Sequence, residues 1–178
     1  MGMICAWGIK ESVLFAGVMT LIEIGGLLAV IASGFIFDYD LLTHYDRLLP
    51  EVWSRETLKS VLAASMLTFF AFIGFEGIEN IAEETIEPRK TLPRGMLLTL
   101  AISTVFSVLV VSIALLTVGP QELASQTAPL AHLFHMTTGL HASLISVVAV
   151  VATLNGVIVQ IIMASRLAYG LSSRGPLP

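Results

Sequence analysis

The chain has 178 residues, of which 56% are hydrophobic and only 12% are charged, and its formal net charge at pH 7 is −4. A soluble globular domain carries about twice that share of charged residues, so the composition excludes an ordinary soluble protein. The nine Lys and Arg residues form no basic patch, which argues against nucleic-acid binding. The single cysteine, Cys5, excludes an internal disulfide and a cysteine-based metal site.

Long apolar segments predict an all-α, multi-pass membrane protein with one membrane domain over residues 1–178. A helix needs about 20 residues to cross the hydrocarbon core of a bilayer. Four segments approach or exceed that length, at about 13–37, 58–82, 96–118 and 140–169. The Lys and Arg residues between these spans favour an N-terminus on the inner side of the membrane.

The first span contains a single charged residue, Glu23, followed by the small residues Gly25 and Gly26. Ionisable residues inside a membrane are costly, and many serve a function. Two readings remain open. Glu23 either faces an aqueous path and exchanges a proton, or it is a hydrogen-bonded carboxyl group used only for helix packing. After this span, the polar stretch 38–56 predicts one or two helical turns on the membrane surface.

The second span is interrupted near its middle by the sequence Gly74-Phe75-Glu76-Gly77. The charge-free run 61–75 is too short for a comfortable crossing. We therefore expect two half-helices around an irregular joint, a feature that marks binding sites in transporters. The half-helix ends and the exposed backbone groups could hold the ammonium and carboxylate groups of an amino acid. The alternative makes Gly74 and Gly77 close-packing positions, with Glu76 at the end of the span.

The segment between the second and third spans contains two prolines. Pro88 and Pro93 are expected to prevent a continuous helix, so residues 86–94 are predicted to form a tight, charged connection. A second polar connection is predicted over residues 121–139. It contains His132 and His135, whose spacing suits metal binding on a helix. No accompanying carboxylate or thiolate completes a site, so loop or interface histidines are favoured and no metal site is predicted.

Two uncharged polar residues, Asn155 and Gln160, lie inside the fourth span. They either form interhelical hydrogen bonds or line the same cavity as the broken segment.

Three motifs resemble the amino acid–polyamine–organocation permeases. FFAFIGFEGIENIAEETIEPRKTLPRG is similar to the sixth helix and following loop of that family, with Glu87 where the loop usually has Asn. LNGVIVQIIMASRLAYGLSSRGPLP resembles the eighth helix, and GIKES with LIEIGGLL resembles the fifth. The resemblance implies a five-plus-five inverted-repeat fold, of which this chain would supply only the fifth to eighth helices.

The resemblance also implies roles for individual residues. Phe70 would be an aromatic gate, Ile73 and Gly74 would offer unwound backbone to the substrate, and Glu76 would serve proton coupling. Gln160 falls near a substrate-facing position of the eighth helix. Some relatives carry a lysine in the fifth helix in place of a coupling cation. No lysine occurs here between Glu11 and Arg55, so that mechanism cannot be assumed.

Taken together, the residues and the resemblance predict secondary active transport of amino acids or related amines, without enzymatic activity or a cofactor. The expected mechanism is alternating access with protons as the coupling ion, in the plasma membrane. The partners would be the substrate, the bilayer and the remaining permease helices, because we expect the chain to be a fragment. The alternative is a self-contained four-helix assembly or regulatory subunit without transport activity.

Overall fold

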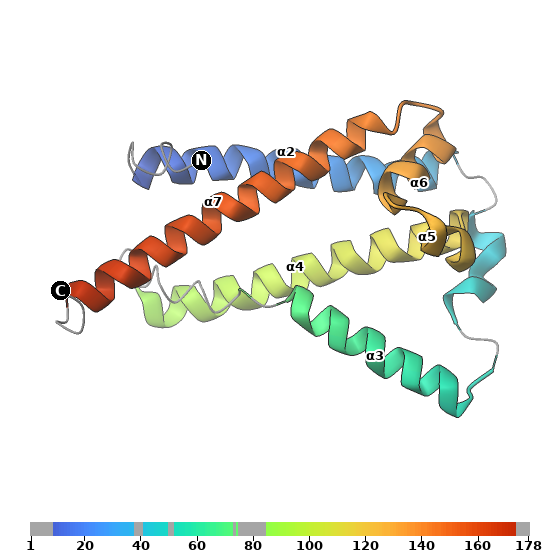
Figure 1. Ribbon diagram of the computed structural model, residues 1–178, viewed down its shortest axis with the longest axis horizontal. Coiled ribbons are helices and arrows are strands. Elements are labelled where there is room, and N and C mark those ends of the chain that lie inside the picture. The colour runs from blue at the N-terminus through green and yellow to red at the C-terminus, as the bar shows by residue number, and fades with distance from the viewer. Residues whose placement is uncertain (1–8, 38–40, 50–51, 73, 75–84, 174–178) are drawn as a thin grey trace.

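The computed structural model describes residues 9–37, 41–49, 52–72, 74 and 85–173, and this part of the chain is helical without strands (Figure 1). Three helices are long enough and apolar enough to cross a membrane: α2, α4 and α7. The helices in chain order are α2 (Ile9–Phe37), the 3₁₀ helix η1 (Leu41–Leu48), α3 (Arg55–Ala71), α4 (Pro88–Thr117), α5 (Pro120–Ser125), α6 (Pro129–Thr138) and α7 (Ser143–Ser173).

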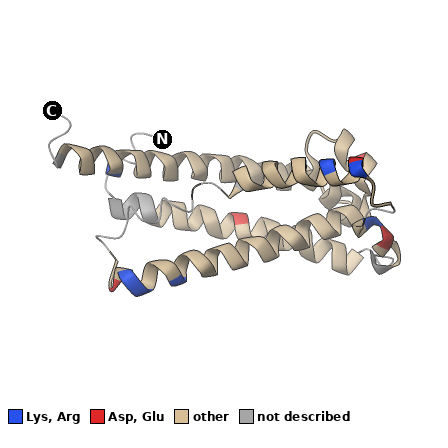
Figure 2. Cartoon of the chain, turned by 90° about the horizontal axis from the view of Figure 1, so that it is seen from below, with Lys and Arg blue, Asp and Glu red and all other residues tan. Residues whose placement is uncertain are grey.

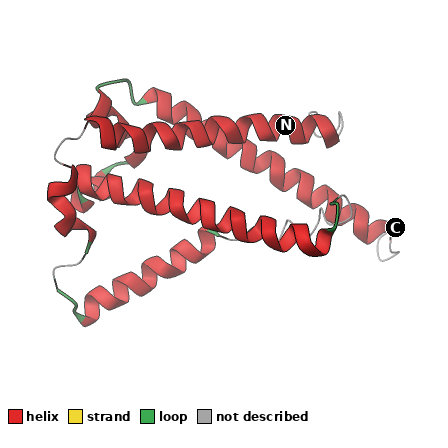
Figure 3. Ribbon diagram, turned by 180° about the vertical axis from the view of Figure 1, so that it is seen from behind, coloured by secondary structure: helices red, strands yellow, loops and turns green. Residues whose placement is uncertain are grey.

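The three long helices run roughly along one direction, and the short helices gather at one end of the bundle (Figures 1 and 3). The start of α2 and the end of α7 lie at the opposite end. Charged residues gather mostly near the two ends of the bundle (Figure 2). This distribution is the one expected when the middle of each long helix lies in hydrocarbon.

Helix α3 covers the described part of the predicted second span, and it has 17 residues. Ser54 caps its N-terminus by accepting a hydrogen bond from the Thr57 N–H at 3.1 Å. The rest of the predicted span falls largely outside the described residues. The four-span count therefore stays a prediction, whereas the first, third and fourth predicted spans correspond to α2, α4 and α7.

Helix α4 begins earlier than the prolines suggested, which corrects the prediction of a tight connection over residues 86–94. Pro88 occupies the first helical turn, where its missing N–H group costs nothing. Pro93 lies inside the helix and removes only one hydrogen bond, to a carbonyl near the exposed N-terminal end. A proline in the second turn therefore did not end this helix.

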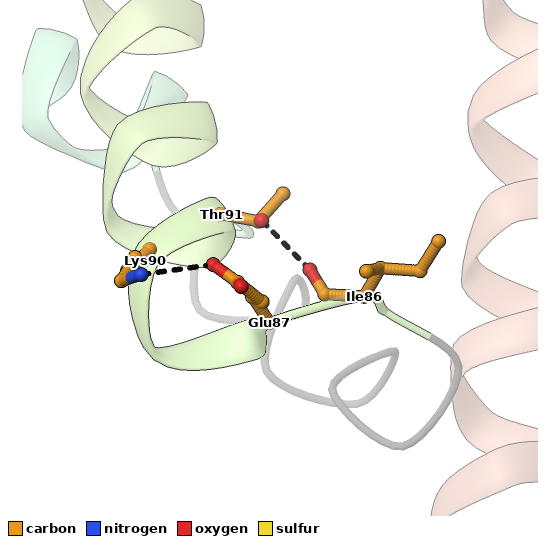
Figure 4. Close-up of polar contacts among 4 residues, drawn as sticks. All are labelled: Ile86, Glu87, Lys90 and Thr91. Carbon is orange, nitrogen blue, oxygen red and sulfur yellow. Dashed lines mark hydrogen bonds and ion pairs between the residues drawn. The ribbon is translucent and has the colours of Figure 1, made fainter.

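The residue before α4, Glu87, adopts a left-handed backbone conformation with φ of +50°. Asn tolerates this conformation better than other residues with side chains, which gives a physical reason for the Asn that similar loops carry at this position. Two side-chain contacts support the turn (Figure 4): Lys90 Nζ lies 3.0 Å from Glu87 Oε2, and Thr91 Oγ1 donates to the Ile86 carbonyl at 2.8 Å.

The main apolar core lies toward the end of the bundle where α6 packs against α2, α4 and α7. Helix α6 belongs to the segment predicted as a polar connection, yet its Leu133 is fully buried. The cluster joins four helices and comprises Val30, Ile31, Val110, Ile113, Ala114, Ala131, Leu133, Phe134 and Ile145. The connection between the long helices thus contributes a helix to the interior of the bundle.

Two glycines of α2 allow close contact with neighbouring helices. A Cβ atom at Gly26 would lie 2.6 Å from Val148 Cγ1 on α7, and a Cβ at Gly34 would overlap Ile113 on α4. By contrast, a Cβ at Gly25 would meet no atom within 4 Å. Small residues at such positions let helix backbones approach closely inside membranes.

Replacing Gly26 by Ala should lower the free energy of unfolding of this chain by about 1–3 kcal/mol, because the added methyl group overpacks the contact with Val148. The measurement is unfolding in mixed detergent micelles followed by circular dichroism. Gly25→Ala is the matched control, since it makes the same chemical change one position away in open space. An equal loss in both variants would contradict the assignment.

Candidate functional site

The predicted substrate site begins at the C-terminal end of α3. The helix ends at Ala71, and the Phe72 N–H group bonds back to the carbonyls of Phe69 and Phe70. Gly74 then has a φ of +121°, a conformation that residues with side chains rarely adopt. The helix therefore stops within the apolar segment, close to the position where the sequence predicts a break.

Phe70 is prominent at this helix end. Its side chain is 67% exposed in the chain, and its ring lies edge-to-face with that of Phe69, with centroids 6.3 Å apart. An exposed aromatic pair offers apolar surface for contact with lipid, a ligand or a further helix. The other predicted residues of this region, Ile73, Glu76 and Gly77, lie outside the described residues, so their roles stay predictions.

A second polar site lies where α2 and α7 are in contact. Asn155 Nδ2 donates hydrogen bonds to Glu23 Oε1 at 2.7 Å and to Thr20 Oγ1 at 3.1 Å. Thr20 in turn donates to the Ala16 carbonyl at 3.0 Å. These bonds are interhelical, so Asn155 does join two helices, which was one of the two readings of this residue.

The Asn155 side chain is not fully satisfied by this arrangement. Asn155 is 5% exposed, and its Oδ1 atom is buried without a hydrogen-bond partner in the described part of the chain. Unpaired buried polar atoms are costly and often mark a place where another group binds. The Asn155 amide therefore uses both of its N–H donors, whereas its Oδ1 acceptor is unused.

Glu23 also lines a pocket of about 570 Å³ between α2, α6 and α7. Most of the pocket wall is apolar, with Gly26 and Val30 of α2 facing Val148 and Ala152 of α7. The described ion pairs, Lys90–Glu87 and His132–Glu122, do not involve Glu23. Glu23 thus has a neutral hydrogen-bond partner on one side and a partly open space on the other.

Gln160, the second polar residue predicted in the fourth span, lies on α7 with its side chain exposed. Phe70 lies on α3, and α3 and α7 make no extensive contact in the described part. The structure therefore brings Glu23 and Asn155 together but does not join Gln160 to the end of α3.

The two histidines of the predicted connection have separate partners. His132 Nε2 lies 2.9 Å from Glu122 Oε1 on α5, and His135 Nδ1 lies 2.7 Å from the Leu140 carbonyl. No group of three or more potential metal ligands occurs among the described residues. Sequence reasoning missed Glu122, which precedes His132 by ten residues and joins α5 to α6.

Long apolar helices, a helix end within an apolar segment and a partly buried Glu–Asn pair define a polytopic membrane protein with polar groups inside its bundle. A family model described as amino acid permease matches residues 1–178. The chain therefore belongs to the amino acid permease family, within the amino acid–polyamine–organocation superfamily, as the sequence motifs implied.

Curated relatives are transporters and permeases rather than enzymes. The chain is 32% identical over 174 residues to the chloroplastic cationic amino acid transporter 9 of Arabidopsis thaliana, covering 96% of this chain and 29% of that protein. It is 28% identical over 175 residues to the methylthioribose transporter of Bacillus subtilis (strain 168), covering 96% of this chain and 36% of the relative.

The branched-chain amino acid permease BcaP of the same bacterium is 28% identical over 176 residues, with 96% of this chain and 36% of the permease covered. The chain thus spans about a third of the length of these relatives. No solved structure matches the chain significantly.

Replacing Asn155 by Leu should lower the free energy of unfolding by about 1 kcal/mol, because the bonds to Glu23 and Thr20 are lost. Gln160→Leu removes an exposed amide from the same helix and serves as the control. A double-mutant cycle of Asn155→Leu with Glu23→Leu, in which each single variant removes the hydrogen bond, should give a nonzero coupling energy when unfolding is measured in detergent. Additive effects would show that the two side chains do not interact.

Proposed function

We propose that this chain forms part of a secondary transporter that moves amino acids or related amines across the plasma membrane by alternating access. The observation that carries the proposal is the family match over the whole chain. The end of α3 at Ala71, followed by Gly74 in a left-handed conformation, supports it. Broken helices whose backbone groups face a cavity are how transporters of this kind bind small charged substrates.

In this proposal the end of α3 supplies one half of the substrate site. The C-terminal end of a helix carries partial negative charge, which favours the ammonium group of an amino acid. Phe70 covers the substrate, and Ile73, Gly74 and Gly77 expose backbone groups to it. Gln160 contributes from α7 when the transporter is assembled. The other half of the site comes from helices that correspond to the parts of the relatives this chain does not match.

Protons are the proposed coupling ion, with Glu76 and Glu23 as the candidate carriers. The contacts of Glu23 support this role. Asn155 Nδ2 can donate to an ionised carboxylate, and its unused Oδ1 can accept the proton of a neutral carboxylic acid after the side-chain amide flips about χ2. Asn155 can therefore satisfy Glu23 in both protonation states. In this proposal, a proton reaches the Glu23 carboxyl group through the pocket that Glu23 lines.

The coupling proposal predicts that uptake of amino acids into proteoliposomes by an intact permease containing this segment depends on external pH. Glu76→Gln or Glu23→Gln should flatten that dependence, because the amide cannot take up a proton. Glu56→Gln, in the exposed first turn of α3, is the control and should keep the wild-type profile. If both test variants retain the full pH dependence, neither carboxyl group carries the coupling proton.

Phe70→Ala should raise the KM for substrate about tenfold, since an aromatic contact with a ligand contributes on the order of 1 kcal/mol or more. The measurement is uptake at varied concentrations of cationic, branched-chain and small neutral amino acids. Leu67→Ala removes another exposed apolar side chain from α3 and should leave KM unchanged. Equal KM values in both variants would show that Phe70 does not contact the substrate. Failure of the wild-type permease to transport any of these amino acids would overturn the proposed function.

A further inference from the structure

A second pocket lies at the end of the bundle where η1, the start of α3 and the link between α4 and α5 meet. Its volume is about 710 Å³, and more of its wall is polar than apolar. The polar lining residues are Asp46, Arg47, Thr57 and Gln121, with Val52 and Val118 among the apolar ones. This pocket is separate from both parts of the site described above.

Arg47 is held in place beside this pocket. Its Nη1 atom donates to the Leu116 carbonyl at 2.9 Å, which ties η1 to the last turn of α4. Gly119 passes close by, with a φ of +88°, and a Cβ there would lie 3.6 Å from Arg47 Nη1. A guanidinium group has five N–H donors, so one bond to a carbonyl leaves donors for a ligand. The described ion pairs do not include Arg47.

The residues around this pocket are of the kinds found where a membrane meets water. The apolar helix α4 ends at Thr117, immediately before the pocket-lining residues 118–121. Tyr45 and Trp53, which are 72% and 69% exposed, lie on the segments that form the pocket. Exposed tyrosine and tryptophan residues are enriched where a membrane meets water. Leu49 and Val52 are exposed to a similar degree and offer apolar surface to a lipid chain.

We propose that this pocket binds the headgroup of a zwitterionic phospholipid of the phosphatidylethanolamine type. Arg47 contacts the phosphate, because the planar guanidinium group matches two phosphate oxygens at once. Asp46 is exposed in the same pocket and contacts the ammonium group. The adjacent opposite charges favour a zwitterion, whereas an anionic headgroup would meet the Asp46 carboxylate. The acyl chains would lie against the exposed apolar residues of the neighbouring segments.

Native mass spectrometry of the purified 178-residue chain tests the proposal, with added phosphatidylethanolamine or phosphatidylglycerol that carry the same acyl chains. The wild-type chain should retain more phosphatidylethanolamine. Arg47→Gln should lower the apparent affinity about tenfold or more, the effect of losing a charge-assisted hydrogen bond. Asp46→Asn should abolish or reverse the preference between the two lipids. Arg55→Gln removes the same charge outside the pocket lining and should behave as the wild type.

Arg47→Gln also removes the hydrogen bond to the Leu116 carbonyl and could thereby unfold part of the chain. A second pair of variants tests the pocket without changing Arg47. Gln121→Glu adds a negative charge to the pocket in the first turn of α5, where an acid does not disturb a helix. Gln126→Glu adds the same charge outside the pocket lining. Gln121→Glu alone should reduce lipid retention. Equal retention in these two variants would overturn the proposal, as would displacement of the lipid by millimolar free amino acid, which would mark a solute site instead.

Discussion

The contact between α2 and α7 at Gly26 and Val148 is the constraint on which much of the described structure depends. These two helices make the most extensive contact in the described part, although they are separated by more than 100 residues. Lipid is as apolar as the helix surfaces, so association must come from close packing and polar contacts rather than from the hydrophobic effect. Gly26 supplies the close packing, and Asn155 with Glu23 supplies the polar contact.

This constraint also explains why the carboxyl group of Glu23 is tolerated inside the bundle. A carboxyl group facing lipid would lack any partner, whereas the close approach of α7 brings an amide to within 2.7 Å. The pocket beside Glu23 lies at the same crossing, with Gly26 of α2, Val148 of α7 and residues 129–131 of α6 in its wall. Packing and chemistry at this crossing therefore have a single structural origin.

The sequence predicted the long helices because hydropathy depends only on local composition. Helices α2, α4 and α7 correspond to the first, third and fourth predicted spans, although α4 begins earlier than predicted, and α3 ends at Ala71, close to the predicted break. Sequence reasoning missed the burial of α6, because Leu133 and Phe134 lie between two histidines in a segment predicted to be polar, and α6 is buried through contacts with α2, α7 and α4. It also overestimated how strongly Pro88 and Pro93 oppose a helix, because the first turns of a helix tolerate proline.

The candidate site was predictable in parts but not as an arrangement. Glu23 and Asn155 were each recognisable as polar residues in apolar spans, yet they are 132 residues apart in sequence and their pairing depends on the register of two helices. Thr20 was not singled out from the sequence. Its spacing of three residues from Glu23 places both on the same helix face, and this spacing was the signal that could have found it. No local pattern specifies such an interhelical register.

The end of α3 differs from the contact between α2 and α7, because its polar groups belong to the backbone rather than to side chains. Along its described length α3 exposes apolar side chains such as Met66, Leu67 and Phe70, so this surface is suited to contact lipid or further helices. The last four carbonyls of any helix lack partners within the helix, and in a membrane they must find them elsewhere. The Phe72 N–H group bonds to the carbonyls of Phe69 and Phe70. A helix that ends inside an apolar segment leaves carbonyl groups that need hydrogen-bond donors, and the partial negative charge of a helix C-terminus favours a cationic donor.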